Sequence, residues 1–253
     1  MHVAVLVAGL AVLAVVLVYA VYGIVLATAV QREDWFDIDD TDGKSDVDRS
    51  RWGMSHDQWR RQVRATMELE PAAVLSSGDH VFELGCGTCA FLDELLAMEP
   101  ALQLSGNDIN GSALGRCRSK HPAGTFEVGK VTELDAGQQY DCIVGNGVLI
   151  YMQSLDEVRE TLAVLDTWLK PGKTMRFTLL DPPITAASFL SFRCSITSGR
   201  LRIPPALFEK FARDHGYKLQ LHFTDVMNGQ GGRRYIAVLE KNSYLPKSSA
   251  SAS

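Results

Sequence analysis

Strand-like and helix-like segments alternate along most of the chain, and this alternation restricts the possible folds more than any other feature of the sequence. Seven short β-like runs are expected to be strands: 80–84, 102–108, 125–128, 140–146, 174–180, 217–223 and 234–240. Helical periodicity lies between most of them, and capping boxes begin two of the helices, Ser55-x-x-Gln58 and Ser154-x-x-Glu157. Such alternation favours a mostly parallel, doubly wound α/β sheet.

The last two strand-like runs break the alternation. Only the segment TDVMNGQGGR separates them, whereas a parallel neighbour would need a longer crossover connection, usually a helix. We therefore expect an antiparallel hairpin at one end of the sheet.

The segment ELGCGTCAFL, which begins at Glu83, follows the first expected strand and fits three kinds of site. Cys86 and Cys89 form a C-x-x-C pattern, as in zinc sites and redox dithiols. A G-x-G-x-x-A pattern that begins at Gly85 is a near match to the loop that binds a dinucleotide pyrophosphate. An acid, Glu83, also precedes the first glycine.

Zinc and redox chemistry are the weaker interpretations of this loop. A structural zinc ion needs four ligands, and Cys117, Cys142 and Cys194 are isolated in the sequence, without a histidine pair at ligand spacing. The hairpin and short domain expected around a thioredoxin-like dithiol are missing. No metal site is therefore predicted. The odd number of cysteines, five, favours a reduced, cytosolic compartment over a disulfide framework.

A dinucleotide site is the more serious alternative. Asp108 lies at the end of the second strand, where an acid about 20 residues beyond the glycines binds ribose in dehydrogenases. However, Glu83 would lie beside the pyrophosphate, where like charges repel. The downstream segments also lack the appearance of a hydride-transfer site.

Four segments resemble motifs of the class I S-adenosylmethionine-dependent methyltransferases. VFELGCGTCAFL resembles the first motif, LSGNDIN the second, YDCIVGNGVLIYM the fourth, and WLKPGKTMRFTLL the turn that enters the fifth strand. The terminal hairpin resembles the reversed last strand of that family. The resemblance covers roughly Ser55 to Lys241. It implies a Rossmann-like, doubly wound, seven-stranded sheet with an antiparallel last strand, and S-adenosylmethionine as the cofactor of a methyl transfer.

The resemblance also implies a set of cofactor-binding residues. They are Glu83, Gly85, Cys86, Gly87, Asp108, Ile109, Val131, Asn146 and Gly147. Glu83 suits the positively charged end of the cofactor, the two loop glycines let the backbone pass close to it, and Asp108 would accept hydrogen bonds from both ribose hydroxyls. Ile109 and Val131 would lie beside adenine, and the last two residues would line the site after the fourth strand.

The sequence departs from the family at two positions. Cys89 stands where a third glycine is usual, and Lys130 stands where many members have an acid that binds the adenine amino group. A lysine cannot accept that hydrogen bond, so a backbone carbonyl or Glu133 would have to replace it. A degenerate, cofactor-binding scaffold without catalysis is the resulting alternative.

The N-terminal run from Val3 to Val30 contains no charged residue. A helix of roughly 20 apolar residues crosses a bilayer, so we expect residues 1–30 to be a single transmembrane anchor. Ala27-Thr28-Ala29 resembles a signal-peptidase site, but the run is longer than the usual apolar region of about 7–15 residues, and no Lys or Arg precedes it.

The remaining boundaries follow from composition. Residues 31–50 are expected to be an acidic, flexible tether, 51–241 the methyltransferase domain, and 242–253 a disordered tail. Basic residues follow the anchor and none precedes it, which favours a cytoplasmic catalytic domain. The sequon Asn110-Gly111-Ser112 would place a glycan beside the ribose site, and this supports the same orientation. The net charge of −5 gives no indication of nucleic-acid binding.

The acceptor is less well defined than the cofactor. Methyl transfer needs a base only when the acceptor carries a proton, and Asp181 and Tyr151 are weak candidates because each follows a strand. His56 and His222 are further options. The insertion at 184–205 is expected to cover the acceptor. The anchor favours a small apolar or membrane-associated acceptor such as a lipid, with a membrane protein as the alternative. The sequence does not indicate an oligomeric state.

Overall fold

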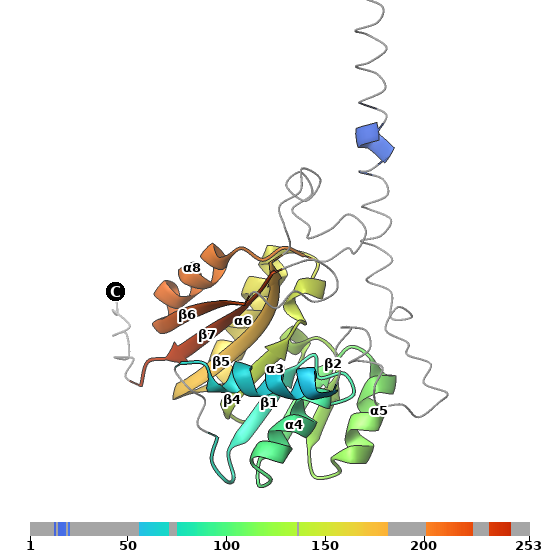
Figure 1. The fold of residues 1–253 in the computed structure, drawn as a ribbon, viewed down its shortest axis with the longest axis vertical. Coiled ribbons are helices and arrows are strands. Elements are labelled where there is room, and N and C mark those ends of the chain that lie inside the picture. Colours follow the sequence, from blue (N-terminus) through green and yellow to red (C-terminus); the bar gives the residue numbers. More distant parts are fainter. Residues whose placement is uncertain are drawn as a thin grey trace, which may run out of the picture.

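A seven-stranded mixed sheet forms the centre of the protein, with the strand order β3-β2-β1-β4-β5-β7-β6 (Figure 1). The structure, a computed structural model, describes residues 13, 15–18, 20, 56–70, 75–135, 137–181, 201–224 and 233–243, without the side chains of 180, 181, 224, 233 and 234. The strands are β1 (His80–Leu84), β2 (Gln103–Asp108), β3 (Thr125–Val128), β4 (Tyr140–Asn146), β5 (Leu169–Asp181), β6 (Tyr217–Thr224) and β7 (Arg233–Lys241).

Strands β1 to β5 run parallel, and β7 is antiparallel to both β5 and β6. The predicted fold class is thereby confirmed for the sheet, including the terminal hairpin and the reversed last strand. β5 begins earlier than predicted because Leu169 already pairs with Tyr140. The register then shifts at a bulge, after which Thr174 pairs with Cys142.

Helices cover both faces of the sheet. They are α3 (His56–Glu68), α4 (Ala90–Met98), α5 (Gly111–Lys120), α6 (Leu155–Trp168) and α8 (Pro205–His215), with short 3-10 helices η2 (Val131–Glu133) and η3 (Leu149–Tyr151). One predicted helix start, at α6, and one predicted helix end, at α8, are confirmed. The Ser154 hydroxyl accepts a hydrogen bond from the Glu157 amide at 3.1 Å, and Gly216 ends α8 in the left-handed region at φ 71°.

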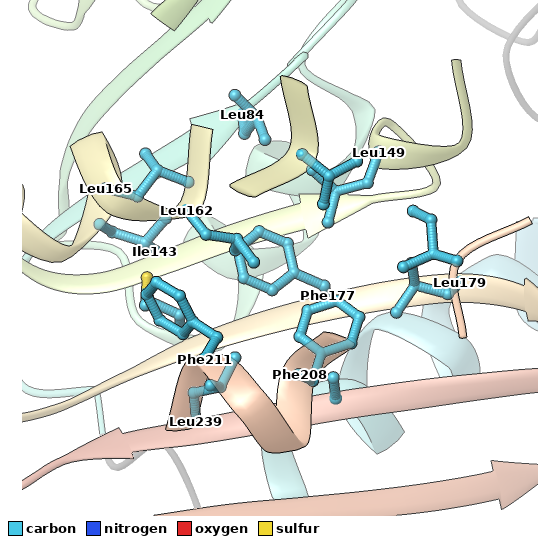
Figure 2. Packing of buried hydrophobic residues seen from close by; sticks show 14 of the residues in the cluster. Leu84, Ile143, Leu149, Leu162, Leu165, Phe177, Leu179, Phe208, Phe211 and Leu239 are labelled. Carbon is cyan, nitrogen blue, oxygen red and sulfur yellow. The ribbon is translucent and has the colours of Figure 1, made fainter. Parts of the chain in front are cut away.

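The alternation of side chains along the strands divides the core into two layers. One layer packs under α6, α8 and η3 and includes Phe82. Figure 2 shows other members of this layer, among them Leu84, Ile143, Leu162, Phe177 and Phe208. The other packs under α3, α4 and α5, and includes Trp59, Val63, Val81, Phe91, Leu92, Leu114 and Val144. Glu83 alternates with Phe82 and Leu84, so it lies on the α3–α4 side of β1, at the strand end where the chain turns towards α4.

The predicted anchor, tether and tail lie largely or wholly outside the described residues, as does most of the insertion at 184–205. Of the apolar N-terminal run, residues 13, 15–18 and 20 are described, and all of them are helical and exposed. Among the residues that the structure describes, no helix combines the length and the apolar character that a membrane crossing requires.

Candidate cofactor-binding site

The predicted site residues come together at the carboxyl ends of β1, β2 and β4. The chain passes from β1 to β2 and β3 on one side of the sheet, and then returns to β4 on the other side. In open parallel sheets, ligands bind at such a reversal of strand order, outside the carboxyl ends of the strands. Of the predicted residues, Glu83, Asp108 and Asn146 lie within the last two positions of these three strands.

The loop after β1 is held in a conformation that requires glycine. Gly85 and Gly87 have φ values of 64° and 52°, in the left-handed region. A Cβ atom on Gly85 would lie 2.3 Å from Cγ2 of Val148, which follows β4. The backbone therefore passes close to the end of β4, and a side chain at Gly85 would close that gap.

Asp108 connects this loop to the start of α5. Its Oδ2 accepts a hydrogen bond from the Gly87 amide at 2.8 Å, and its Oδ1 accepts one from the Asn110 amide at 2.9 Å. Asn110 in turn caps α5 by accepting a hydrogen bond from the Ala113 amide. A carboxylate fixed in this way at the end of β2 is positioned to accept hydrogen bonds from a neighbouring ligand.

Glu83 gives the site a second acid. It is only 3% exposed and pairs in the sheet with Gly106 of β2 and Val144 of β4. Burial raises the pKa of the Cys86 thiol well above its usual range, and the nearby Glu83 and Asp108 carboxylates raise it further. The loop is therefore an electronegative environment, which suits a cationic ligand and opposes a pyrophosphate.

Sequence reasoning missed Asn107, which joins three strand ends. Its Nδ2 donates to the Gly129 carbonyl at 2.9 Å, and its Oδ1 accepts from the Gly85 amide at 3.4 Å. The Gly129 amide also donates to the Asp108 carbonyl at 3.0 Å. The available signal was a short polar side chain directly before the predicted ribose acid, in a strand that is buried on both faces.

The segment after β3 explains the departure at Lys130. The Lys130 ammonium lies 2.9 Å from Oε1 of Glu157 on α6, and this hydrogen bond raises the pKa of the lysine. Val131 is buried at the start of η2, whereas Glu133 is exposed and its Oε2 lies close to Gly129. The Lys130 charge is thus paired with α6, and the backbone of this segment remains beside the ends of β2 and β3.

The end of β4 is contacted from α3. Asn146 Oδ1 accepts a hydrogen bond from Gln62 Nε2 at 3.3 Å, and the Gly147 amide donates to the Thr178 carbonyl at 3.0 Å. Gln62 is a second residue that the sequence did not indicate, since its partner lies far away in the chain. Ile109, by contrast, is 40% exposed next to Asp108, so its apolar side chain is available to a ligand.

In the described part of the chain, the structure does not bring the weak catalytic candidates to the loop glycines. Tyr151 ends η3 and is half-buried against the α6–α8 layer of the core. The Asp181 side chain lies outside the described residues, although its backbone pairs with Arg233. His56 lies 3.7 Å from Glu94, and His222 lies 3.2 Å from the Glu70 carbonyl, so both histidines have contacts away from the loop glycines.

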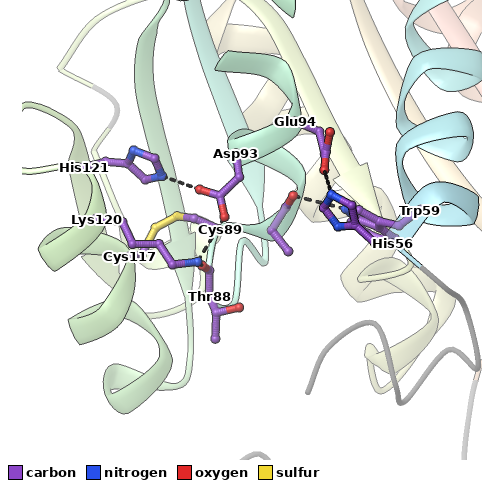
Figure 3. Close-up of polar contacts among 10 residues, drawn as sticks. His56, Trp59, Thr88, Cys89, Asp93, Glu94, Cys117, Lys120 and His121 are labelled. Carbon is purple, nitrogen blue, oxygen red and sulfur yellow. Dashed lines mark hydrogen bonds and ion pairs between the residues drawn. A yellow bond between two sulfur atoms is a disulfide. The ribbon is translucent and has the colours of Figure 1, made fainter. Parts of the chain in front are cut away.

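Three cysteines meet beneath the loop, contrary to the expectation that Cys117 is isolated. Cys89 and Cys117 form a disulfide (Figure 3). The sulfur atoms of Cys86, Cys89 and Cys117 all lie within 4.8 Å of one another. Three thiolates at this spacing could hold a soft metal ion, but the disulfide occupies two of them. The expectation failed because it considered spacing in the sequence, whereas the contact depends on how α5 packs beside α4.

The comparisons with known proteins agree with this geometry. Residues 82–173 match a family described as a methyltransferase domain. The malonyl-[acyl-carrier protein] O-methyltransferase of Halalkalibacterium halodurans is 31% identical over 128 residues, which make up 48% of this chain and 44% of that relative. The matched part therefore spans less than half of the relative's length.

Two solved structures share the fold. The N-methyltransferase NodS from Bradyrhizobium japonicum WM9 has a TM-score of 0.57 and 15% identity, covering 85% of this chain and 98% of NodS. Magnesium protoporphyrin IX methyltransferase from Synechocystis PCC 6803 has a TM-score of 0.57 and 16% identity, covering 80% and 90%. Both contain S-adenosylhomocysteine, the product of the predicted cofactor. Residues 82–173 thus match a methyltransferase domain, and the described part of the chain has the fold of these two S-adenosylhomocysteine-bound methyltransferases.

Proposed function

We propose that the protein transfers a methyl group from S-adenosylmethionine to a small, apolar or membrane-associated acceptor. One observation carries the proposal: Glu83, the Gly85–Gly87 loop and Asp108 converge at the carboxyl ends of β1 and β2. Asp108 is assigned to the ribose hydroxyls and Glu83 to the positively charged amino-acid end. Ile109 and the backbone at Val131 are assigned to adenine, and Asn146 and Gly147 to the wall beside the methyl group.

The chemistry requires alignment more than proton transfer. S-adenosylmethionine, when bound, would supply a methyl group on a positively charged sulfur. The acceptor's lone pair would bond to the methyl carbon in line with the carbon–sulfur bond, which breaks as S-adenosylhomocysteine leaves. The protein contributes by holding the acceptor and the methyl group in alignment and by excluding water. The buried Glu83 carboxylate favours a cation at the end of β1. A proton is removed only if the acceptor carries one at attack, and Tyr151 and Asp181 are then the proposed bases.

The two departures from the family are compatible with catalysis. Cys89 adopts φ 65°, the backbone conformation that a glycine would supply. Lys130 is paired with Glu157, so its charge is compensated outside the adenine position. These contacts favour an active enzyme over a degenerate cofactor-binding scaffold, which remains the alternative function.

The acceptor class rests on the apolar run at residues 1–30. If this run anchors the chain, the catalytic domain works beside a bilayer and encounters apolar small molecules at high local concentration. The related proteins named above act on different acceptors, so they do not identify one for this chain. A protein acceptor at the membrane is the rival within the same activity.

A labelling experiment tests the reaction and its acceptor together. The full chain in detergent micelles is incubated with S-adenosylmethionine carrying a labelled methyl group and with either membrane or soluble extract. We expect label in the organic-solvent fraction of the membrane extract, and a Glu83→Gln variant should transfer at least tenfold less. Label confined to protein would favour the rival acceptor, and no transfer to either extract would contradict the proposed activity.

A further inference from the structure

The glycine-rich loop contains one residue that does not suit its own backbone. Cys89 has φ 65°, and it is the only non-glycine residue with a positive φ in the part of the chain that the structure describes. A residue with a Cβ atom pays a steric penalty in this region that glycine does not. The Cys89 side chain also makes no capping hydrogen bond to α4. Something other than local preference must therefore hold the loop in this conformation.

The disulfide to Cys117 is the contact that can do so. The Cα atoms of Cys89 and Cys117 lie 5.3 Å apart, within the range that a disulfide requires. Cys117 lies on α5, and this helix begins just after Asp108, the acid that accepts a hydrogen bond from the Gly87 amide. The bridge therefore joins the loop after β1 to the helix after β2, on both sides of the proposed ribose position.

Polar contacts lie around the bridge and join α5 to α4 and to the loop before it (Figure 3). Lys120 Nζ donates to the Thr88 carbonyl at 3.1 Å and to Asp93 Oδ2 at 3.0 Å, and His121 Nε2 lies 2.7 Å from Asp93 Oδ1. Both bridged cysteines are fully buried. A small thiol or disulfide can therefore reach them only when α4 and α5 separate locally.

We propose that Cys89 and Cys117 form a redox-responsive clamp on the cofactor loop. The bridged form holds the loop in its binding conformation, and reduction lets Cys89 leave the left-handed region and weakens cofactor binding. The inference rests on the proposed function. On oxidation, the two S–H bonds break and one S–S bond forms. A small-molecule disulfide takes up the two electrons and two protons and leaves as two thiols.

Cys86 is the third member of the cluster and does not compete for the bridge. Its side chain packs against the position that a Cβ of Gly106 would occupy, with the Sγ 3.0 Å from that position. Burial and the neighbouring carboxylates raise the pKa of its thiol, so it remains protonated and is a poor nucleophile. The Cys89–Cys117 pair should therefore persist without exchange to Cys86–Cys89.

Calorimetry with S-adenosylhomocysteine tests the clamp on the full chain in detergent micelles. The protein is first equilibrated with oxidised glutathione or with dithiothreitol, and peptide mass mapping records the Cys89–Cys117 bridge in each sample. We expect the bridged form to bind about tenfold more tightly. Cys117→Ser should bind like the reduced protein under both conditions. Cys89→Gly should bind like the bridged protein under both conditions, since glycine adopts the loop conformation without strain.

Cys142→Ala is the matched control, because Cys142 is a buried free cysteine in β4 outside the cluster, and this variant should keep the full redox response. Equal affinities of the two wild-type samples would overturn the clamp and leave the proposed function intact. Absence of the bridge after oxidation would also overturn it. If neither sample binds S-adenosylhomocysteine, the proposed function falls, and the clamp falls with it.

Discussion

Gly85 is the residue at which the backbone and its surroundings both exclude a side chain. We expect Gly85→Ala to lower the free energy of unfolding by roughly 3 kcal/mol, because it combines the strain of a positive φ with a clash against Val148. Gly78→Ala is the matched control: its φ is 85°, but a Cβ there meets nothing within 4 Å. It should cost only about 1 kcal/mol. Urea unfolding measures both, and equal losses would show that the contact with Val148 does not matter.

At the same scale, the sequence predicted residues better than it predicted their partners. The sequence predicted that Glu83, Gly85, Gly87 and Asp108 lie together, because they stand at fixed offsets from a strand end in a motif. The Asn107 bridge and the Cys117 disulfide could not, because each depends on a neighbour that is distant in sequence or on another strand. Motif spacing specifies what one loop presents, whereas tertiary packing decides which side chain meets it.

At the scale of elements, two buried cationic side chains of the sheet donate hydrogen bonds to carbonyls at helix C-termini. Arg176 on β5 donates to the Thr66 carbonyl at 2.7 Å and to the Leu69 carbonyl at 3.1 Å, at the end of α3. Lys241 on β7 donates in the same way to the Asp166 and Leu169 carbonyls at the end of α6. Cations at helix C-termini are also favoured by the helix dipole.

These two cations make a matched pair of substitutions. Arg176→Met and Lys241→Met should each lower the free energy of unfolding by roughly 2–3 kcal/mol, since buried carbonyls lose charged donors. Only Arg176→Met should also weaken S-adenosylhomocysteine binding. Arg176 contacts the end of α3, and Gln62 on this helix donates a hydrogen bond to Asn146, a proposed site residue. Chemical denaturation and calorimetry measure the two effects. Equal loss of affinity in both variants would mean that α3 has no special part in the site.

Asp166 makes the junction of α6, α8 and β6 sensitive to pH. Its carboxylate accepts from the Tyr217 hydroxyl at 2.6 Å and lies 3.0 Å from His215 Nδ1 and 2.9 Å from Lys241 Nζ. Burial alone would raise the pKa of Asp166, but the hydrogen bonds from Tyr217, Lys241 and His215 outweigh it and lower the pKa.

A folded-state pKa below the unfolded value of about 3.9 stabilises the protein above that pH, and the contribution is lost as the pH falls through the lower folded-state value. Asp166→Asn should therefore be about 1–3 kcal/mol less stable than the wild type at pH 7. The difference should shrink as the pH falls below the unfolded value and through the lower folded-state pKa. Thermal unfolding across this range provides the measurement, and a difference that stays constant with pH would exclude the carboxylate charge as its source.

At the scale of the whole molecule, the sheet could be predicted almost completely, because the alternation of short apolar runs and capped helices leaves few other topologies. The bulge that lengthens β5 could not, since it depends on the pairing of Leu169 with Tyr140. Predictions for residues 1–50 and 242–253 rest on composition alone.

The proposed topology has a direct cellular test. With residues 1–30 as an anchor, the full chain should stay with membranes after alkaline carbonate extraction, and deletion of these residues should release it. A cytoplasmic domain should show no glycosidase-sensitive change in mobility at Asn110 in a eukaryotic host. Such a change would place the domain in an oxidising compartment, where the Cys89–Cys117 bridge would be permanent rather than responsive.

The most direct test of the account is calorimetry of S-adenosylhomocysteine binding to the full chain and to its Asp108→Ala variant. Loss of the carboxylate that we propose binds the ribose should weaken binding about 100-fold, the effect of losing two charged hydrogen bonds. The control is Asp214→Ala, which removes an exposed ion pair with Lys210 on α8 and should bind like the wild type. A wild-type protein that binds no S-adenosylhomocysteine, or an Asp108→Ala variant that binds it with unchanged affinity, would contradict the account.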